Sequence, residues 1–101
     1  MVIGSSKHAV IAMTRQIAVD YAADNIRCNA LCPGFVDTPF NHGFERQMGG
    51  REVLESYVAR SIPIGRWATV DEIAESIVYL ASDQSSFMTG HALVVDGGEC
   101  L

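Results

Sequence analysis

The sequence predicts an α/β fold that contains only part of a sheet. Patterns typical of helices and strands alternate along the 101 residues, in the order helix, strand, loop, helix, helix, strand. This alternation favours a layered α/β arrangement over a helical bundle or a β-sandwich. Only two segments have strand character, and the connection between them is long enough for a helical crossover, so the strands should lie parallel. Two strands are marginal alone, and we therefore expect residues 1–101 to be the carboxyl-terminal part of a larger α/β domain.

The first helix is expected from about Ser6 to Ala23. Its larger apolar residues recur at steps of three and four, and they are Val10, Met13, Ile17 and Tyr21. Alanines occupy many of the positions around them. This spacing is typical of a helix that packs one apolar face against its neighbours. We predict a buried helix that other elements approach closely.

The first strand is expected after a turn at Asp24–Asn25. Alternate side chains of a strand point to opposite faces, and one face here would carry Ile26, Cys28, Ala30 and Cys32. Pro33–Gly34 then ends the strand, because proline and glycine interrupt regular structure.

The stretch from Phe35 to Gly50 has little periodicity. It contains a proline and several glycines, at Pro39, Gly43, Gly49 and Gly50. We predict a loop with a short helical piece, and we expect this loop to be the most mobile part of the chain. The next helix should run from about Arg51 to Arg60, with its apolar residues at Leu54, Tyr57 and Val58. Pro63 disfavours helix at the residue before it.

The last helix has a clear start signal. Thr69 is followed three residues later by Glu72, a spacing typical of a capping box, in which the two side chains bond to free backbone amides at the helix start. The expected core stripe is Ile73, Ile77 and Leu80, and the helix should end near Asp83. Ala92–Val95 is a continuous apolar run between glycines, as expected of a strand covered on both faces.

Charge and cysteine content exclude several classes of function. The net charge is −5 and there is no cluster of Lys or Arg, so nucleic acids and anionic membranes are not expected partners. No apolar run approaches the ~20 residues that cross a bilayer. The three cysteines have no paired spacing typical of zinc or redox sites, and the histidines are scattered. These features indicate a cytoplasmic protein without a metal site.

Four segments occur in the order found in one enzyme family. They are Ser6–Val10, Asn25–Ala30, Pro33–Pro39 and Val94–Gly98. Together they resemble the short-chain dehydrogenase/reductase family, and the similarity runs essentially end to end. The resemblance implies a Rossmann-like parallel sheet, and it is strongest to the group that includes 3-oxoacyl-[acyl-carrier-protein] reductases and related alcohol and sugar dehydrogenases.

The resemblance assigns a role to Lys7. Family members have a catalytic tyrosine and, four residues later on the same side of a helix, a lysine. That lysine binds the nicotinamide ribose and lowers the pKa of the phenol, whose ordinary value is about 10. Lys7 stands at the lysine position, but Ile3 stands where the tyrosine should be. The family's catalytic serine and asparagine would precede Met1. Without the family, Lys7 would read as a solvated helix residue.

The resemblance also implies cofactor contacts after the first strand. Pro33 and Gly34 stand at the carboxyl end of a strand, where open α/β sheets bind ligands, and Gly34 permits close approach of the backbone. The backbone at Val36 would meet the nicotinamide carboxamide, and the Thr38 hydroxyl would lie near the carboxamide or the phosphates. The alternative is a plain Pro-Gly turn.

Three functions remain open from the sequence. The chain is a fragment of an NAD- or NADP-dependent oxidoreductase that acts on an alcohol or carbonyl substrate and is inactive alone. Alternatively, it is a non-catalytic module that pairs with a full-length relative or with a separately encoded upstream half, or a truncated gene product without a function. A homo-oligomer is also an expected assembly. The glycine-rich turn that holds pyrophosphate and the residue that selects NAD or NADP are both missing.

Overall fold

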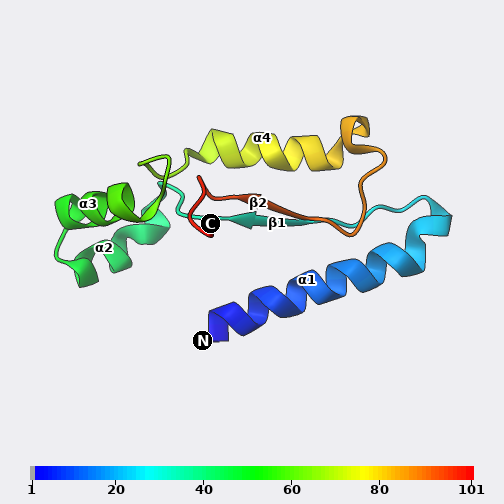
Figure 1. The fold of residues 1–101 in the computed structure, drawn as a ribbon, viewed down its shortest axis with the longest axis horizontal. Coiled ribbons are helices and arrows are strands. Elements are labelled where there is room, and N and C mark those ends of the chain that lie inside the picture. The colour runs from blue at the N-terminus through cyan, green and yellow to red at the C-terminus, as the bar shows by residue number, and fades with distance from the viewer. Residues whose placement is uncertain (1) are drawn as a thin grey trace. The chain divides into compact units, whose positions relative to one another are not determined.

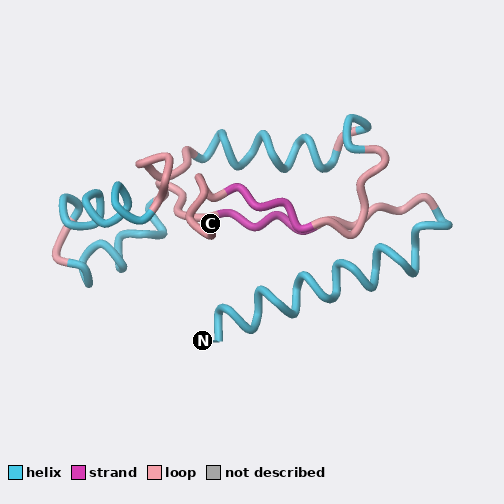
Figure 2. The backbone as a smooth tube through the Cα atoms, viewed as in Figure 1, coloured by secondary structure: helices cyan, strands magenta, loops and turns pink. Residues whose placement is uncertain are grey.

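A computed structural model describes the backbone of residues 2–101 and the side chains of residues 7–39 and 41–101 (Figure 1). The elements are α1 (Val2–Tyr21), β1 (Ala30–Pro33), α2 (His42–Met48), α3 (Arg51–Ser61), α4 (Val70–Ala81) and β2 (Ala92–Val95). Short 3₁₀ turns follow α1, precede α2 and follow α4. Figure 2 shows the resulting alternation of helices and strands along the backbone. The chain divides into two compact units, residues 1–32 with 77–93 and residues 33–76 with 94–101.

β1 and β2 form a two-stranded sheet. The N–H of Ala30 donates to the carbonyl of His91 at 2.8 Å, and the N–H of Gly34 donates to the carbonyl of Val95 at 3.1 Å. Both strands therefore advance together along the ladder, which is the parallel arrangement. The predicted α/β class and the incomplete sheet are confirmed. The predicted bounds of β2 are also correct.

α1 is far less buried than its pattern predicted. Its buried side chains are Thr14 and Ala18, whereas Val10 is 55% exposed and Met13 is 61% exposed. The prediction of a buried apolar stripe was wrong for the described part of this helix. A stripe of this kind needs a broad sheet or a second helix to cover it, and a sheet of two strands offers too little surface. The close approach occurs at Ala18, where a Cβ on Gly90 would lie 3.4 Å away.

The first strand begins later than predicted, at Ala30 instead of Ile26. Just before Ala30, side chains make several of the hydrogen bonds between the two segments. The Asn29 amide donates to the carbonyl of Met88 at 3.1 Å and accepts from the N–H of His91 at 3.0 Å. The Cys28 N–H similarly donates to the Thr89 hydroxyl at 3.1 Å. A backbone bond also remains here, since the N–H of Gly90 donates to the carbonyl of Cys28 at 2.7 Å. Alternation of apolar residues could not reveal that side-chain bonds replace part of the ladder.

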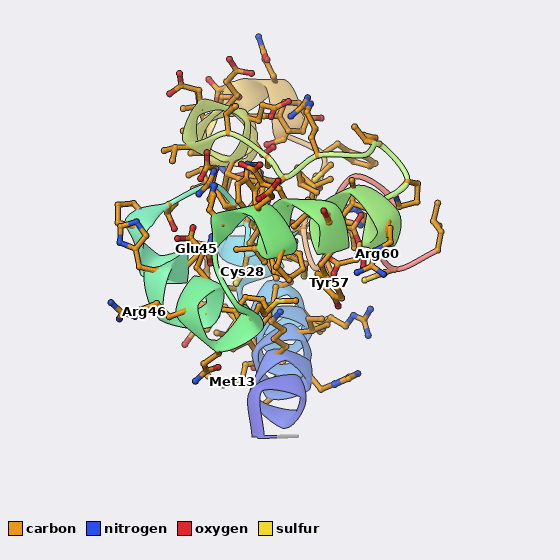
Figure 3. The ribbon with its side chains drawn as sticks, turned by 90° about the vertical axis from the view of Figure 1, so that its left-hand side faces the viewer. Met13, Cys28, Glu45, Arg46, Tyr57 and Arg60 are labelled. Carbon is orange, nitrogen blue, oxygen red and sulfur yellow. The ribbon has the colours of Figure 1, made fainter. Side chains whose placement is uncertain are left out.

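The other unit has its core on α3. Leu54, Val58 and Ile62 are buried, and Phe35, Met48 and Trp67 pack against them in part. The Tyr57 ring meets the edge of Phe35 with ring centroids 6.0 Å apart. Figure 3 views α2 and α3 from this side, with Glu45, Arg46, Tyr57 and Arg60 labelled. The predicted span of α3 and its apolar positions are confirmed.

The stretch from Phe35 to Gly50 contains the short helical piece that the sequence predicted. α2 has no buried residue within its described side chains. It ends at Gly49, and both Gly49 (φ 101°) and Gly50 (φ 117°) adopt a positive φ that other residues rarely tolerate. Phe44 stacks on Phe35 with ring centroids 6.0 Å apart. This stretch and α3 therefore form a helical hairpin, in which Gly49 and Gly50 join α2 to α3.

The capping box at the start of α4 is confirmed. The N–H of Glu72 donates to the Thr69 hydroxyl at 3.2 Å, and the N–H of Thr69 donates to the Glu72 carboxylate at 2.9 Å. The expected core stripe is not buried, since Ile77 is 53% exposed. On β2, Val94 is 54% exposed, so the prediction of cover on both faces was wrong. Both misses have the same cause as in α1, because apolar patterning does not reveal whether a covering layer is present.

Glu72 makes the stability of this helix start depend on pH. Hydrogen bonds from Arg66, and then from the Thr69 amide, lower the pKa of Glu72 to about 2 from its ordinary value of 4.5. Because the pKa is lower in the folded state, the stabilisation is present above pH 4.5 and is lost as the pH falls toward 2. We expect the urea midpoint of Glu72→Gln to lie below that of the parent at pH 6 and to converge with it as the pH approaches ~2. A difference that persists unchanged at the lower pH contradicts this.

Candidate functional site

The turn that follows β1 is held by a second chain segment. The N–H of Asp37 donates to the carbonyl of Ala68 at 2.9 Å, and the N–H of Ala68 donates to the carbonyl of Phe35 at 2.9 Å. These bonds make Val36 and Ala68 a parallel bridge. In such a bridge the N–H and C=O of the central residue point away from the partner segment. The polar groups of Val36 therefore point to the other side of the turn.

The two polar groups of Val36 differ in their partners. Its carbonyl accepts from the side-chain amide of Asn41. Among the described residues no acceptor pairs with its N–H. Val36 is half-buried, and a partly buried amide without a partner is uncommon in proteins. The N–H is therefore a donor in a fixed direction that a ligand could satisfy.

The Thr38 hydroxyl is also available. Thr38 is extended (φ −137°, ψ 159°) and precedes the 3₁₀ turn Pro39–Asn41, but its side chain does not cap that turn. Its carbonyl accepts from the N–H of Asn41 at 3.1 Å. The backbone of Thr38 is thus fixed, and its hydroxyl has no hydrogen-bond partner among the described residues.

Gly34 is required by the packing of the chain itself. A Cβ at this position would lie 2.8 Å from the Cβ of Asp96 and 3.0 Å from a carboxylate oxygen of Glu99. The ends of the two strands meet here, so that the glycine allows the backbones to approach. Pro33, immediately before it, is exposed at the end of β1. The close approach at Gly34 in this structure is to Asp96, whereas the expected approach of a cofactor to Gly34 stays a prediction.

Asp96 organises the end of β2. Its carboxylate accepts from the N–H of Gly98 at 2.9 Å and from the N–H of Cys100 at 3.1 Å. A hydrogen bond from the Cys100 side chain, and then these amide bonds, hold the pKa of Asp96 below its usual value. Gly97, with φ 64°, lies where a Cβ would be 2.7 Å from Ile62. The terminal turn therefore packs directly on the core next to α3.

Arg51, the first residue of α3, connects several elements of this unit. Its three guanidinium nitrogens each pair with a different carboxylate, at 3.1 Å to Asp37, 3.1 Å to Glu45 and 3.0 Å to Glu55. The guanidinium carbon also lies 4.1 Å from the centre of the Trp67 ring. The hydrogen bond to Glu55, together with those to Glu45 and Asp37, raises the pKa of the Arg51 guanidinium.

Lys7 belongs to the other unit. It lies on α1 and its side chain is exposed. Ile3 is on the same helix, but its side chain lies outside the described residues. The helical spacing of four residues puts both positions on one side of α1, as the sequence predicted.

The sequence did not identify the residues that hold the turn in place. Ala68 and Asn41 fix Val36, and Arg51 binds the Asp37 carboxylate. None of them belongs to a motif that we recognised. The sequence did contain one signal for these contacts. Opposite charges near a loop often pair, and Asp37, Glu45 and Arg51 each stand within a few residues of a glycine in or next to this loop.

The unit that contains the turn has a small cavity of about 100 Å³, which is lined by residues that include Phe35, Ile62 and Val95. Sites for ligands of drug-like size usually measure ~300 to 1,000 Å³. Among the described residues no group of His, Cys, Asp or Glu is arranged to hold a metal ion. In the same part of the chain, no helix is long and apolar enough to cross a membrane.

The sequence and the fold match known proteins. Residues 1–99 match a family model described as "Enoyl-(Acyl carrier protein) reductase". The chain is 46% identical over 99 residues to the 2-keto-3-deoxy-L-fuconate dehydrogenase of Xanthomonas campestris, covering 96% of this chain and 33% of that protein. It is 42% identical to dehydrogenase/reductase SDR family member 6 of Aquarana catesbeiana, covering 99% of this chain and 41% of that protein.

Solved structures show the same similarity. A carboxyl-terminal deletion mutant of the aldohexose dehydrogenase of Thermoplasma acidophilum superposes with a TM-score of 0.85 at 39% identity, over 95% of this chain and 44% of that one. A 4-hydroxyisoleucine dehydrogenase complexed with NADH superposes with a TM-score of 0.84 at 34% identity, over 94% and 37%. The chain belongs to the short-chain dehydrogenase/reductase family. It spans about a third to two-fifths of the length of these curated relatives.

Proposed function

We propose that this chain forms the nicotinamide-facing part of an NAD- or NADP-dependent short-chain oxidoreductase of the cytoplasm. The complete enzyme moves a hydride between the nicotinamide and an alcohol or carbonyl carbon. The cofactor supplies the redox chemistry, and the protein orients it and provides a path for the proton. The chain by itself lacks the proton donor, because Ile3 replaces the tyrosine, and it is inactive alone.

The N–H of Val36 is the observation that carries this proposal. The bridge to Ala68 and the bond from Asn41 fix its direction, and it has no acceptor among the described residues. A carboxamide oxygen of a nicotinamide is a suitable acceptor for such a donor. The Thr38 hydroxyl, two residues on, has no partner in the described part of the chain and is suited to the carboxamide or the adjoining phosphates. Pro33 and Gly34 place this turn at the carboxyl end of the strand, where sheets of this class bind ligands.

Lys7 has a supporting role in this proposal. Its ammonium group binds the ribose hydroxyls of the nicotinamide nucleoside and, in a relative with tyrosine four residues earlier, lowers the pKa of that phenol. Without the tyrosine, Lys7 keeps the ribose contact and loses the proton-transfer role.

A second candidate function is assembly. The exposed apolar residues on α1 and the exposed Val94 on β2 favour a partner that covers them. The partner would be a second copy of the chain or a full-length relative that contributes the missing strands. Co-purification with a full-length relative supports this reading, and a monodisperse monomer with cooperative unfolding counts against it.

The cofactor contact at Thr38 can be tested in a chimera. In this chimera, the chain replaces the matching segment of the Xanthomonas campestris dehydrogenase. We expect Thr38→Val to weaken NADH binding about two- to tenfold, the value of one hydrogen bond, because valine keeps the shape and loses the hydroxyl. Fluorescence titration with NADH measures the change.

Thr38→Ser is the matched control, since it retains a hydroxyl at the same carbon. It should bind NADH within a factor of about two of the parent chimera. Equal affinity of the valine and serine variants for NADH would show that the hydroxyl makes no contact with the cofactor.

A further inference from the structure

The paired nitrogens of Arg51 point in three directions. One carboxylate, Glu55, lies one turn further along α3, whereas Asp37 belongs to the turn after β1 and Glu45 belongs to α2. The face of the guanidinium rests on Trp67, which precedes α4. One side chain therefore joins the turn, the short helix and the segment before α4 to the start of α3.

This arrangement requires an arginine. A planar guanidinium presents donors along several fixed directions and stacks on an aromatic ring, whereas the ammonium group of lysine is a compact point charge. A single exposed ion pair contributes little, but several acceptors that share one cation form a network with defined geometry. Without the cation, the Asp37, Glu45 and Glu55 carboxylates would face one another and repel.

α2 has few other attachments. None of its described side chains is buried, and the glycines at Gly49 and Gly50 with positive φ connect it to α3. Phe44 stacks on Phe35, and Met48 packs at the edge of the core. A seven-residue helix attached by these contacts can pivot at the glycines if its ion pair is lost.

We propose that Arg51 is a positioning residue that locks α2 to the Asp37–Thr38 turn, so that the helix and the cofactor-facing turn keep one arrangement. The identity of the turn as cofactor-facing rests on the proposed function, whereas the lock itself does not. Arg51 acts through Asp37, the neighbour of Thr38, and through Glu45. It contacts neither the cofactor nor the reacting atoms.

Hydrogen exchange on the full chain tests the lock without any nucleotide. In Arg51→Gln we expect amide exchange across residues 38–48 to become about tenfold faster, since several exposed pairs worth a few-fold each act on one segment. Exchange across α4 should stay unchanged. The emission of Trp67, the only tryptophan, should shift to longer wavelength because its ring loses the guanidinium cover.

Matched variants separate the lock from a loss of charge. Arg60→Gln removes the same charge from the same helix, and within the described residues Arg60 bonds only to the carbonyl of Ser56 one turn earlier. Glu55→Gln removes a carboxylate without touching another element. Neither variant should change exchange across residues 38–48. Arg51→Lys keeps the charge but loses the planar guanidinium and its several donors. In this variant, the amides of residues 38–48 should exchange nearly as fast as in Arg51→Gln.

Two outcomes would overturn the proposal. One is exchange across residues 38–48 that is the same in Arg51→Gln as in Arg60→Gln. The other is faster exchange throughout both α3 and α4, which would make Arg51 a general stabilising residue. If Arg51→Gln does not fold, the double variant Asp37→Asn with Glu45→Gln leaves the Arg51–Glu55 pair intact and must give the same local acceleration. The effect of Thr38→Val on NADH binding tests the proposed function only, and it does not test the role of Arg51.

Discussion

Ile3→Tyr in the chimera should raise the rate of turnover about 10² to 10⁴-fold, which is the usual contribution of a general acid. The substitution restores a phenol four residues before Lys7, on the same side of α1. The ammonium group then lowers the pKa of the phenol toward the working pH and allows it to exchange a proton with the substrate oxygen. The measurement is the steady-state rate at which the chimera oxidises 2-keto-3-deoxy-L-fuconate, the substrate named for the Xanthomonas enzyme. The formation of NADH reports this rate.

Ile3→Phe is the control for this gain. It introduces the same ring without the hydroxyl and should leave the rate at the level of the Ile3 chimera. The 101-residue chain alone should show no turnover with NADH or NADPH and a panel of ketones. Recovery by phenylalanine, or an Ile3 chimera that is already as fast as the tyrosine variant, would show that the proton comes from elsewhere.

The sequence correctly predicted those features that depend on residues close together in the chain. The capping box at Thr69 and Glu72 gave the start of α4, because its partners are three residues apart. The glycines on either side of Ala92–Val95 gave the bounds of β2. The Pro33–Gly34 pair gave the end of β1 and the location of the candidate turn.

The misses all depend on residues distant in the sequence. The start of β1 depends on Asn29, whose side chain bonds to Met88 and His91 about sixty residues later. The direction of the Val36 N–H depends on Ala68. Exposure of α1 depends on how much sheet lies beside it. No periodicity within one element can report such partners, so the sequence pointed to the turn after β1 as a candidate site but did not reveal the residues that support it.

Leu54→Ala should lower the free energy of unfolding by about 2 to 5 kcal/mol. Leu54 is 0% exposed and lies at the centre of the cluster with Val58 and Ile62. Truncation removes its buried methyl groups and leaves a cavity that the rigid surroundings fill only in part. Since typical domains are stable by only ~5 to 15 kcal/mol, the variant loses a large share of its stability. Urea unfolding followed by the fluorescence of Trp67, which packs against this cluster, measures the loss.

Val53→Ala is the neighbouring control on the same helix. Val53 is 45% exposed, and its truncation should change the free energy by less than about 0.5 kcal/mol, as for most surface substitutions. With urea m-values of ~1 to 3 kcal/mol per M, the urea midpoints of the two variants should differ by about 0.5 M or more. Coincident midpoints would mean that α3 does not form the core of its unit. The same result would remove the rigid support on which Arg51 and the turn after β1 depend, because both are anchored to the start of that helix.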